Sequence, residues 1–299
     1  MTKGIQLEIN ELLELRYYVN KVKSIKNKRR SNSPQFGEKA SYARGRGMDF
    51  AEVRRYQGGD DIRLIHWPLT ARLGKTFTKV YHEERERMVY LLIDQSFSMK
   101  FGTRVAFKNI IAAKVASLLG WSFLSQQEQV GGVIFNDSGL AYIKPKRTYQ
   151  SLFDMFNILI SNKVKQYQGG LNNTLKFMLG NIHSGSSVVV ISDYNNLNEE
   201  TENYLKIIAS KCELVNILIY DPLEESFPDL GTFSFTNEGK NILEISATKH
   251  NKEQYKMHFV KRLEQLKTLS KQNKVRLITI ATNDDIIDKI KHGILDYGN

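Results

Sequence analysis

The sequence predicts an α/β fold, with a mostly parallel β-sheet flanked by helices and a small β-rich extension at its amino-terminal end. From residue 88 onward, strand-like apolar runs alternate with longer helical patterns, which is the signature of strand–helix–strand units. The runs at 88–94 and 187–193 are apolar almost to their last residues, as strands buried on both faces are. Residues 49–86 instead combine turn signals with one segment of strand composition at 75–81, which predicts the extension.

The expected elements after residue 88 form a regular series. Strands are predicted at 88–94, 130–136, 140–144, 187–193, 214–220 and 275–282. Helices are predicted at 104–126, 148–161, 173–182, 199–211 and 252–273, and a last short helix follows. An insertion at about 222–247 contains two strand-like segments on either side of an Asn-Glu-Gly turn, and it is predicted to be a hairpin.

The beginning of the chain is predicted to be helical. Residues 4–24 carry Ile, Leu and Val side chains at helical spacing, whereas 31–37 and 44–47 are rich in Gly, Pro and polar residues and are typical of loops. We therefore expect two domains. Residues 1–86 would hold this helix and the β-rich extension, and residues 87–299 would form the α/β domain with the hairpin insertion.

Positive charge is concentrated in the first part of the chain. The formal net charge is +11, and residues 1–90 contain 19 Lys/Arg against 11 Asp/Glu. The densest basic run, 21–30, is of a kind that can contact nucleic acid or an anionic membrane surface. No aromatic interleaving or nucleic-acid-binding module accompanies it, so we do not expect nucleic-acid binding and keep both associations only as an alternative function.

The sequence also limits location and covalent chemistry. The first residues lack the uninterrupted apolar stretch of a signal peptide, and the apolar segment 115–124 is well short of the roughly 20 residues that a membrane-spanning helix needs. We therefore expect a cytoplasmic protein with no integral membrane segment. Cys212 is the single cysteine, which excludes an internal disulfide.

Oxygen-bearing side chains follow the ends of two predicted strands. Asp94, Ser96 and Ser98 come at and just after the end of the 88–94 strand, and Asp193 ends the 187–193 strand. Ligands of open α/β sheets collect outside the carboxyl ends of the strands, and carboxylate, hydroxyl and water oxygens suit magnesium. The sequence therefore predicts one metal site at this edge, although each Asp could instead cap the helix that follows it.

The Asp94-x-Ser96-x-Ser98 spacing, with Ser192-Asp193 ending a later strand, resembles the metal-ion-dependent adhesion site of von Willebrand factor A domains. The segment 47–72, including Asp60-Asp61 and His66-Trp67, is similar to the hallmark segment of the bacterial family known as domain of unknown function 58. Asp221-Pro222-Leu223-Glu224 and Pro228-x-x-Gly231 are also similar to this family, and the resemblance runs from about residue 10 to residue 290.

This resemblance implies a Rossmann-like von Willebrand A domain with an amino-terminal β-rich extension. It places Asp94, Ser96, Ser98 and Asp193 on the metal-site positions, where they would hold one Mg²⁺ or Mn²⁺ per chain. The family's threonine directly follows a Gly-Gly pair, but here the pair is followed by Leu171-Asn172-Asn173-Thr174, so that either Asn173 or Thr174 takes this place. In such sites, one coordination position is left for an acidic residue of the partner.

The resemblance further implies a non-catalytic protein-binding module, acting as an adaptor or chaperone partner of a MoxR-type AAA+ ATPase or binding that ATPase's client. No small-molecule substrate is expected. The alternative is a phosphotransferase-like enzyme with Asp94 as nucleophile. That chemistry needs an acid/base carboxylate nearby, and position 96 carries Ser.

A second group of candidates consists of charged and aromatic residues in the extension and at the start of the insertion. We expect them to contact the partner, although the charges of the extension could instead hold that small domain together. This partner-binding set is Arg54, Arg55, Asp60, Asp61, Arg63, Trp67, Asp221 and Glu224.

Overall fold

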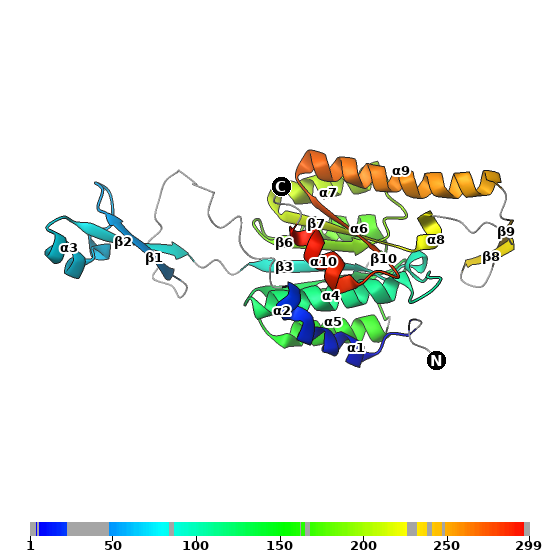
Figure 1. The fold of residues 1–299 in the computed structure, drawn as a ribbon, viewed down its shortest axis with the longest axis horizontal. Coiled ribbons are helices and arrows are strands. Elements are labelled where there is room, and N and C mark those ends of the chain that lie inside the picture. The colour runs from blue at the N-terminus through cyan, green and yellow to red at the C-terminus, as the bar shows by residue number, and fades with distance from the viewer. Residues whose placement is uncertain are drawn as a thin grey trace. The chain divides into compact units, whose positions relative to one another are not determined.

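The computed structural model (Figure 1) describes residues 4, 6–22, 48–83, 87–161, 163–164, 168–225, 232–237, 241–246 and 249–295. The chain divides into two compact units. The larger unit, called here the α/β unit, comprises Met1–Arg30 with Arg87–Asn299, and the smaller unit comprises Ser31–Glu86.

In the described part of the α/β unit, six strands form one sheet. Their spatial order is β10 (Arg276–Ala281), β7 (Glu213–Tyr220), β6 (Ser187–Ser192), β3 (Met88–Asp94), β4 (Gln129–Phe135) and β5 (Leu140–Lys146). All neighbouring pairs are parallel except β4 and β5. The chain fills the sheet from β3 to one edge and then from β6 to the other, so the strand order reverses between β3 and β6. The predicted fold class is confirmed.

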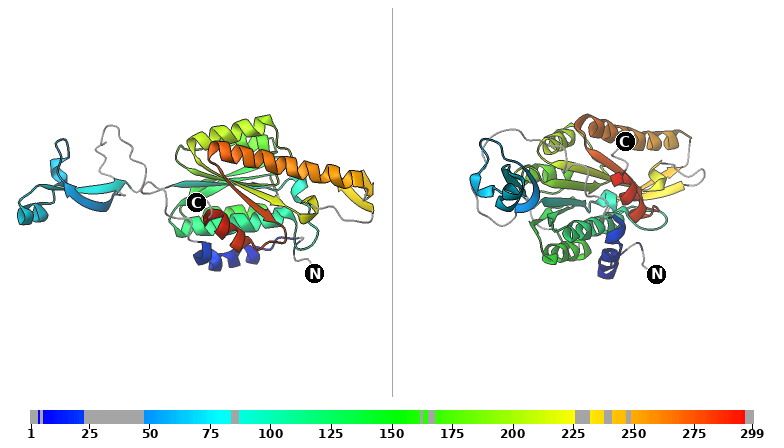
Figure 2. Two further views of the ribbon diagram at one scale, coloured as in Figure 1. Left: turned by 45° about the horizontal axis from the view of Figure 1, so that its top comes forward. Right: turned by 60° about the vertical axis from the view of Figure 1, so that its left-hand side comes forward.

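Helices cover both faces of the sheet and enclose two hydrophobic cores (Figures 1 and 2). Alternate side chains of β3 enter opposite cores, with Leu91 on one face and Leu92 on the other, as the two-residue period of a strand requires. One core is closed by α4 (Lys108–Ser125), α5 (Tyr149–Ser161) and α10 (Ile286–Leu295). The other is closed by α6 (Leu171–Leu179), α7 (Glu199–Lys211) and α9 (Lys249–Asn273).

The amino-terminal helices belong to the α/β unit. They form α1 (Ile9–Glu14), the 3₁₀ turn η1 (Leu15–Tyr18) and α2 (Val19–Val22), a shorter and less regular run than the predicted helix over 4–24. The backbone carbonyl of Leu12 accepts hydrogen bonds from Ser117 Oγ at 2.7 Å and Trp121 Nε1 at 3.0 Å, both on α4. The prediction that this helix shares a domain with residues 49–86 is therefore wrong, because its apolar face packs on α4.

The small unit is built on an antiparallel pair, β1 (Met48–Arg55) and β2 (Phe77–Glu83). Between them lie η3 (Ile62–Leu64) and α3 (Trp67–Leu73), a helix that the sequence reasoning missed. The signals for α3 are present in the sequence: Pro68 lies in its first turn, and Gly74 follows its end at a φ of 65°. Pro at the start and Gly after the end are the common boundaries of a helix.

The predicted hairpin insertion is present as β8 (Thr232–Asn237) and β9 (Asn241–Ser246), an antiparallel pair that follows the short α8 (Pro222–Glu225). Cys212 is buried as a free thiol. Among the described residues, no helix is both long enough and apolar enough to cross a bilayer.

The packing of α1 on α4 can be tested with Leu12→Ala. Leu12 is fully buried, so we expect the substitution to lower the free energy of unfolding of the α/β unit by about 2–5 kcal/mol. Tyr17→Ala is the matched control, because Tyr17 is 83% exposed on the adjacent turn, and we expect it to cost less than about 1 kcal/mol. Urea denaturation followed by circular dichroism measures both. Equal effects of the two variants would contradict this placement of the helix.

Candidate functional site

The strand ends of β3 and β6 lie side by side at the point where the strand order reverses. The two strands pair in parallel up to Ile93 opposite Ile191, so Asp94 and Ser192, the last residues of these strands, are neighbours. Asp94 is 4% exposed. Its Oδ1 accepts a hydrogen bond from the Ser96 backbone N–H at 2.8 Å, and its Oδ2 accepts one from the Ser192 hydroxyl at 2.6 Å. This confirms the prediction that the two strand ends form one rim.

The two predicted serine ligands lie together just beyond Asp94. Ser96 precedes the 3₁₀ turn η4 (Phe97–Met99), which contains Ser98, and the two hydroxyl oxygens are 3.2 Å apart. The backbone N–H of Phe97, the residue between the two serines in the sequence, donates to the carboxylate of Asp137 at 2.7 Å. Asp137 is exposed and comes from the turn after β4, and the sequence reasoning did not select it.

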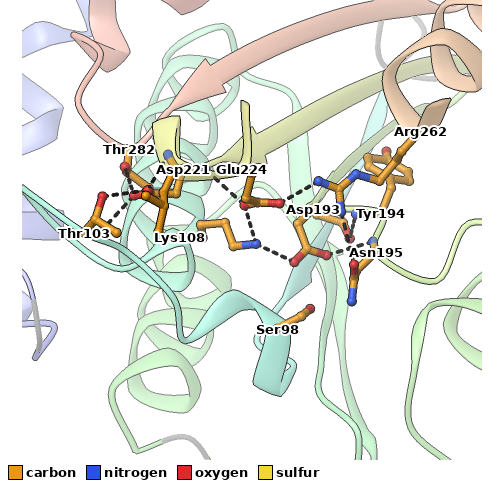
Figure 3. Close-up of polar contacts among 12 residues, drawn as sticks. Ser98, Thr103, Lys108, Asp193, Tyr194, Asn195, Asp221, Glu224, Arg262 and Thr282 are labelled. Carbon is orange, nitrogen blue, oxygen red and sulfur yellow. Dashed lines mark hydrogen bonds and ion pairs between the residues drawn. The ribbon is translucent and has the colours of Figure 1, made fainter. Parts of the chain in front are cut away.

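Asp193 lies at the rim, but it bonds to a cation from the protein itself. Lys108, the first residue of α4, donates from Nζ to Asp193 Oδ2 and to Glu224 Oε1, each at 2.8 Å. Arg262 on α9 bonds the other carboxylate oxygen of Glu224 at 2.6 Å. Figure 3 shows these contacts as one chain of alternating charges that joins β6, α4, α8 and α9. We call these four residues the buried charge chain.

The two acids of the rim, Asp94 and Asp193, have pKa values shifted in opposite directions, because only Asp193 belongs to the buried charge chain. Burial alone raises the pKa of Asp193, but the Lys108 ammonium, together with the Arg262 charge and the Asn195 backbone N–H, outweighs burial and holds the pKa below its usual value. Burial lowers the pKa of Lys108, yet Asp193 and Glu224 together raise it above normal. Asp94 differs because burial, followed by the negative charge of Asp193, raises its pKa to about 7. The hydrogen-bond donors to Asp94 in the described structure are uncharged, so its carboxyl is the acid of the rim that lacks a compensating charge.

The donor set of Asp94, Ser96 and Ser98 fits a hard divalent cation. One carboxylate and two adjacent hydroxyls supply oxygen ligands, and magnesium commonly retains water in the remaining positions. Asp193 fits less directly, because the Lys108 ammonium, a cation of the protein itself, already bonds one of its oxygens at 2.8 Å. Within the described residues, no group of three or more His, Cys, Asp or Glu is arranged to hold a metal, so a cation here would depend on the hydroxyls.

The alternative ligands Asn173 and Thr174 are engaged in the first turn of α6. Thr174 is fully buried, and its hydroxyl donates to the Gly170 carbonyl at 2.9 Å. The side-chain amide of Asn173 donates to the Gly169 carbonyl at 2.8 Å. This loop lies near the end of β4, since the Gly170 N–H donates to the Asn136 carbonyl. Both side chains thus have partners within their own loop.

Asp221 is not available to a partner. It is fully buried, and it accepts hydrogen bonds from the Thr103 backbone and hydroxyl and from the Thr282 hydroxyl at 2.6–3.0 Å. Burial raises its pKa, but these donors, together with the Leu223 backbone N–H, outweigh burial and lower the pKa below its usual value. The prediction that Asp221 contacts a partner is therefore wrong, since Asp221 joins the loop before α4 to the ends of β7 and β10.

The other predicted partner contacts fall into two groups. Glu224 is 7% exposed and belongs to the buried charge chain, and Arg54 pairs with Asp60 at 2.7 Å within the small unit. Asp61 accepts from the Arg63 backbone N–H and caps η3. The exposed members of the set, which stay candidates for partner contact, are Arg55, Arg63 and Trp67.

The sequence reasoning missed Lys108 and Arg262. A signal for Lys108 exists: it is the first residue of a mostly apolar helix, where the helix dipole disfavours a cation. A lysine in that position indicates an acidic partner nearby. No comparable signal identifies Arg262, because basic residues are frequent throughout α9.

The raised pKa of Asp94 predicts a pH-dependent stability. A carboxyl whose pKa is higher in the folded state stabilises the fold when protonated, and this contribution is lost as pH rises from about 4 through about 7. Relative to Asp94→Asn, metal-free wild type should lose up to about 4 kcal/mol of its free energy of unfolding over this interval. Denaturation in EDTA at several pH values measures the difference, and parallel pH profiles for the two proteins would contradict the assignment.

The buried charge chain predicts a large cost for removing Lys108. Lys108→Met leaves Asp193 and Glu224 buried without this cation, and we expect a loss of about 3–5 kcal/mol in the free energy of unfolding. Lys114→Met is the control on the same helix, because Lys114 pairs with Glu11 at 3.1 Å with both side chains more than a fifth exposed, and it should cost about 1 kcal/mol or less. If chemical denaturation gave comparable losses of unfolding free energy for the two variants, the stabilising role of the buried charge chain would be contradicted.

Comparison with known proteins identifies the family to which this chain belongs. A family model described as "Protein of unknown function DUF58" matches residues 52–267. Uncharacterized proteins of Mycobacterium bovis and Mycobacterium tuberculosis are 26% identical over 192 residues, which is 62% of this chain and 59% of theirs. The chain thus spans less than two thirds of the length of these relatives.

Two solved structures resemble parts of the chain at low similarity. The conserved hypothetical protein BatB from Bacteroides thetaiotaomicron has a TM-score of 0.42 at 13% identity, over 71% of this chain and 98% of its own. A von Willebrand factor type A structure from Catenulispora acidiphila has a TM-score of 0.39 at 11% identity, over 73% of this chain and 45% of its own. The family match, which covers more than half of the 299 residues, carries the conclusion: this chain belongs to the DUF58 family of proteins of unknown function.

Proposed function

We propose that this chain is a non-catalytic protein-binding module that depends on a divalent cation. The observation that supports it is the convergence of Asp94, Ser96 and Ser98 where the strand order reverses. Ligands of open α/β sheets gather at this point. The residues are oxygen donors of the kind that magnesium uses, and the carboxyl among them is buried without a compensating charge.

In this proposal, Asp94, Ser96 and Ser98 bind one Mg²⁺ or Mn²⁺ and leave a position for a partner's Asp or Glu. Asp193 contributes through water, because the Lys108 ammonium already bonds its carboxylate and compensates its charge. Asn173 or Thr174 would contribute in the same indirect way, since their side chains bond to their own loop. The cation binds two acids, one from each protein, and thereby makes their association depend on metal.

The partner that we propose is a MoxR-type AAA+ ATPase or a client of that ATPase, in the cytoplasm. Support comes from the family membership and from the resemblance of the rim residues to an adhesion-type metal site. The exposed Arg55, Arg63 and Trp67 of the small unit would supply further contacts to the same partner.

Calorimetric titration tests the cation. We expect Mg²⁺ or Mn²⁺ to give saturable heat with wild type at one ion per chain. Ser98→Ala should weaken binding at least about tenfold, and Asp94→Asn should abolish it, since each removes an oxygen ligand or its charge. Asp288→Asn is a control with the same loss of charge at an exposed position of α10. The absence of saturable heat with wild type would remove the cation from the proposal.

Co-purification from cell extract with and without EDTA tests the class of function. A MoxR-type ATPase retained by wild type in Mg²⁺, but neither in EDTA nor by Asp94→Asn, is the expected result. Turnover of a phosphate ester that disappears in Asp94→Asn would instead favour the enzymatic alternative, because only the phosphotransferase-like hypothesis makes Asp94 a nucleophile.

A further inference from the structure

A groove of about 370 Å³ lies beside the rim, between the loop after β6 and helix α9. Asn195, two residues after Asp193, lines one wall, and Lys261 and Arg262 of α9 line the opposite one. Leu197 and Phe259 add apolar surface, Phe259 being only 5% exposed. The groove therefore combines polar and apolar side chains in its lining.

The charge of the groove is positive. Helix α9 contains seven Lys/Arg and two Glu in its 25 residues, and Lys261 and His258 are exposed where the helix borders the groove. The single acid of the lining, Glu224, already bonds two cations, Lys108 and Arg262. The buried charge chain balances two cations against two acids, so the exposed Lys261 supplies the uncompensated positive charge that a ligand meets.

Arg262 has donor capacity beyond its bonds in the described structure. Nη2 bonds Glu224 at 2.6 Å, and Nη1 donates to the Asn195 side-chain oxygen at 3.2 Å. Nε is buried and has no acceptor among the described residues. The guanidinium carries five N–H donors, and a carboxylate is a stronger acceptor for them than a neutral amide oxygen. Packing against the Phe259 ring, 5.6 Å from the guanidinium carbon, orients the group.

We propose that this groove binds an acidic side chain of a protein partner, with Lys261 and Arg262 as its cationic contacts. The inference rests on the proposed function in that it assigns the chemistry of the same partner, but it does not depend on the metal ion. The apolar side chains of Leu197 and Phe259 fit the aliphatic part of a Glu side chain. A row of phosphates would gain nothing from these two apolar side chains, which argues for protein over nucleic acid as the occupant.

The groove is connected to the rim through the buried charge chain. Arg262 bonds Glu224, Glu224 bonds Lys108, and Lys108 bonds Asp193, with each contact at 2.6–2.8 Å. A partner segment with two acidic residues would therefore meet two adjoining sites of different chemistry. One acid would use the cation at Asp94, and the other would use the side chains of α9.

Fluorescence anisotropy of a labelled hexaglutamate peptide, in EDTA and about 0.15 M salt, where exposed charges are screened beyond about 8 Å, tests the groove. We expect Lys261→Glu to raise the dissociation constant at least about fivefold relative to wild type, because the substitution sets a like charge against the ligand. Lys267→Glu is the matched control: it makes the same charge change at an exposed position of α9 outside the groove, and it should change the constant less than about twofold. Thermal melting verifies that both variants are folded.

Three outcomes would overturn the proposal. Equal weakening by Lys261→Glu and Lys267→Glu would mean diffuse attraction to a basic helix. Binding of a hexaglutamine peptide as tight as that of hexaglutamate would remove the role of charge. Tighter binding of a single-stranded oligonucleotide of about 12 nucleotides, with the same response to Lys261→Glu, would assign the groove to nucleic acid. Because EDTA is present throughout, these results are independent of whether Asp94 binds a cation.

Discussion

The ion pairs of Lys108 are the interaction on which the rest of the site depends. An ammonium on a side chain that is only 4% exposed is expensive to remove from water, and it is tolerated here because Asp193 and Glu224 both accept its hydrogen bonds. Those contacts hold the start of α4 to the ends of β6 and β7, elements far apart in the chain. They also provide Asp193 with a permanent counter-ion, so the two acids of the rim cannot be equivalent.

The fold explains why this difference matters for function. Parallel pairing of β3 with β6 places Asp94 beside Ser192 where the strand order reverses, and Asp94 is left with neutral donors only in the described structure. The rim thus contains one acid neutralised by the protein and one that is not. A cation at Asp94 would compensate the charge of that carboxylate, and an acidic partner residue would pair with the cationic side chains of the groove. The buried charge chain connects the two sites.

Much of this fold could be predicted from the sequence, because buried strands are marked by continuous apolar runs such as Val188–Val190 and the helices between them by their spacing. Asp94, Ser96 and Ser98 could be found because they are close in sequence and follow such a strand. Lys108, Glu224 and Arg262 could not be assembled in this way, since their partners lie 38 to 116 residues away. The placement of Leu12 against α4 was missed for the same reason, as an amphipathic pattern does not name the surface that it covers.

The central claim is that Asp94 is the acid of the rim that takes a cation. Carbon-13 NMR of the aspartate carboxyl groups, titrated by pH with and without Mg²⁺ and assigned with Asp94→Asn, tests it most directly. Without Mg²⁺, the account predicts that Asp94 titrates near pH 7. With saturating Mg²⁺, its pKa should fall well below that, because the cation stabilises the carboxylate. A titration of Asp94 that Mg²⁺ leaves unchanged would contradict the account.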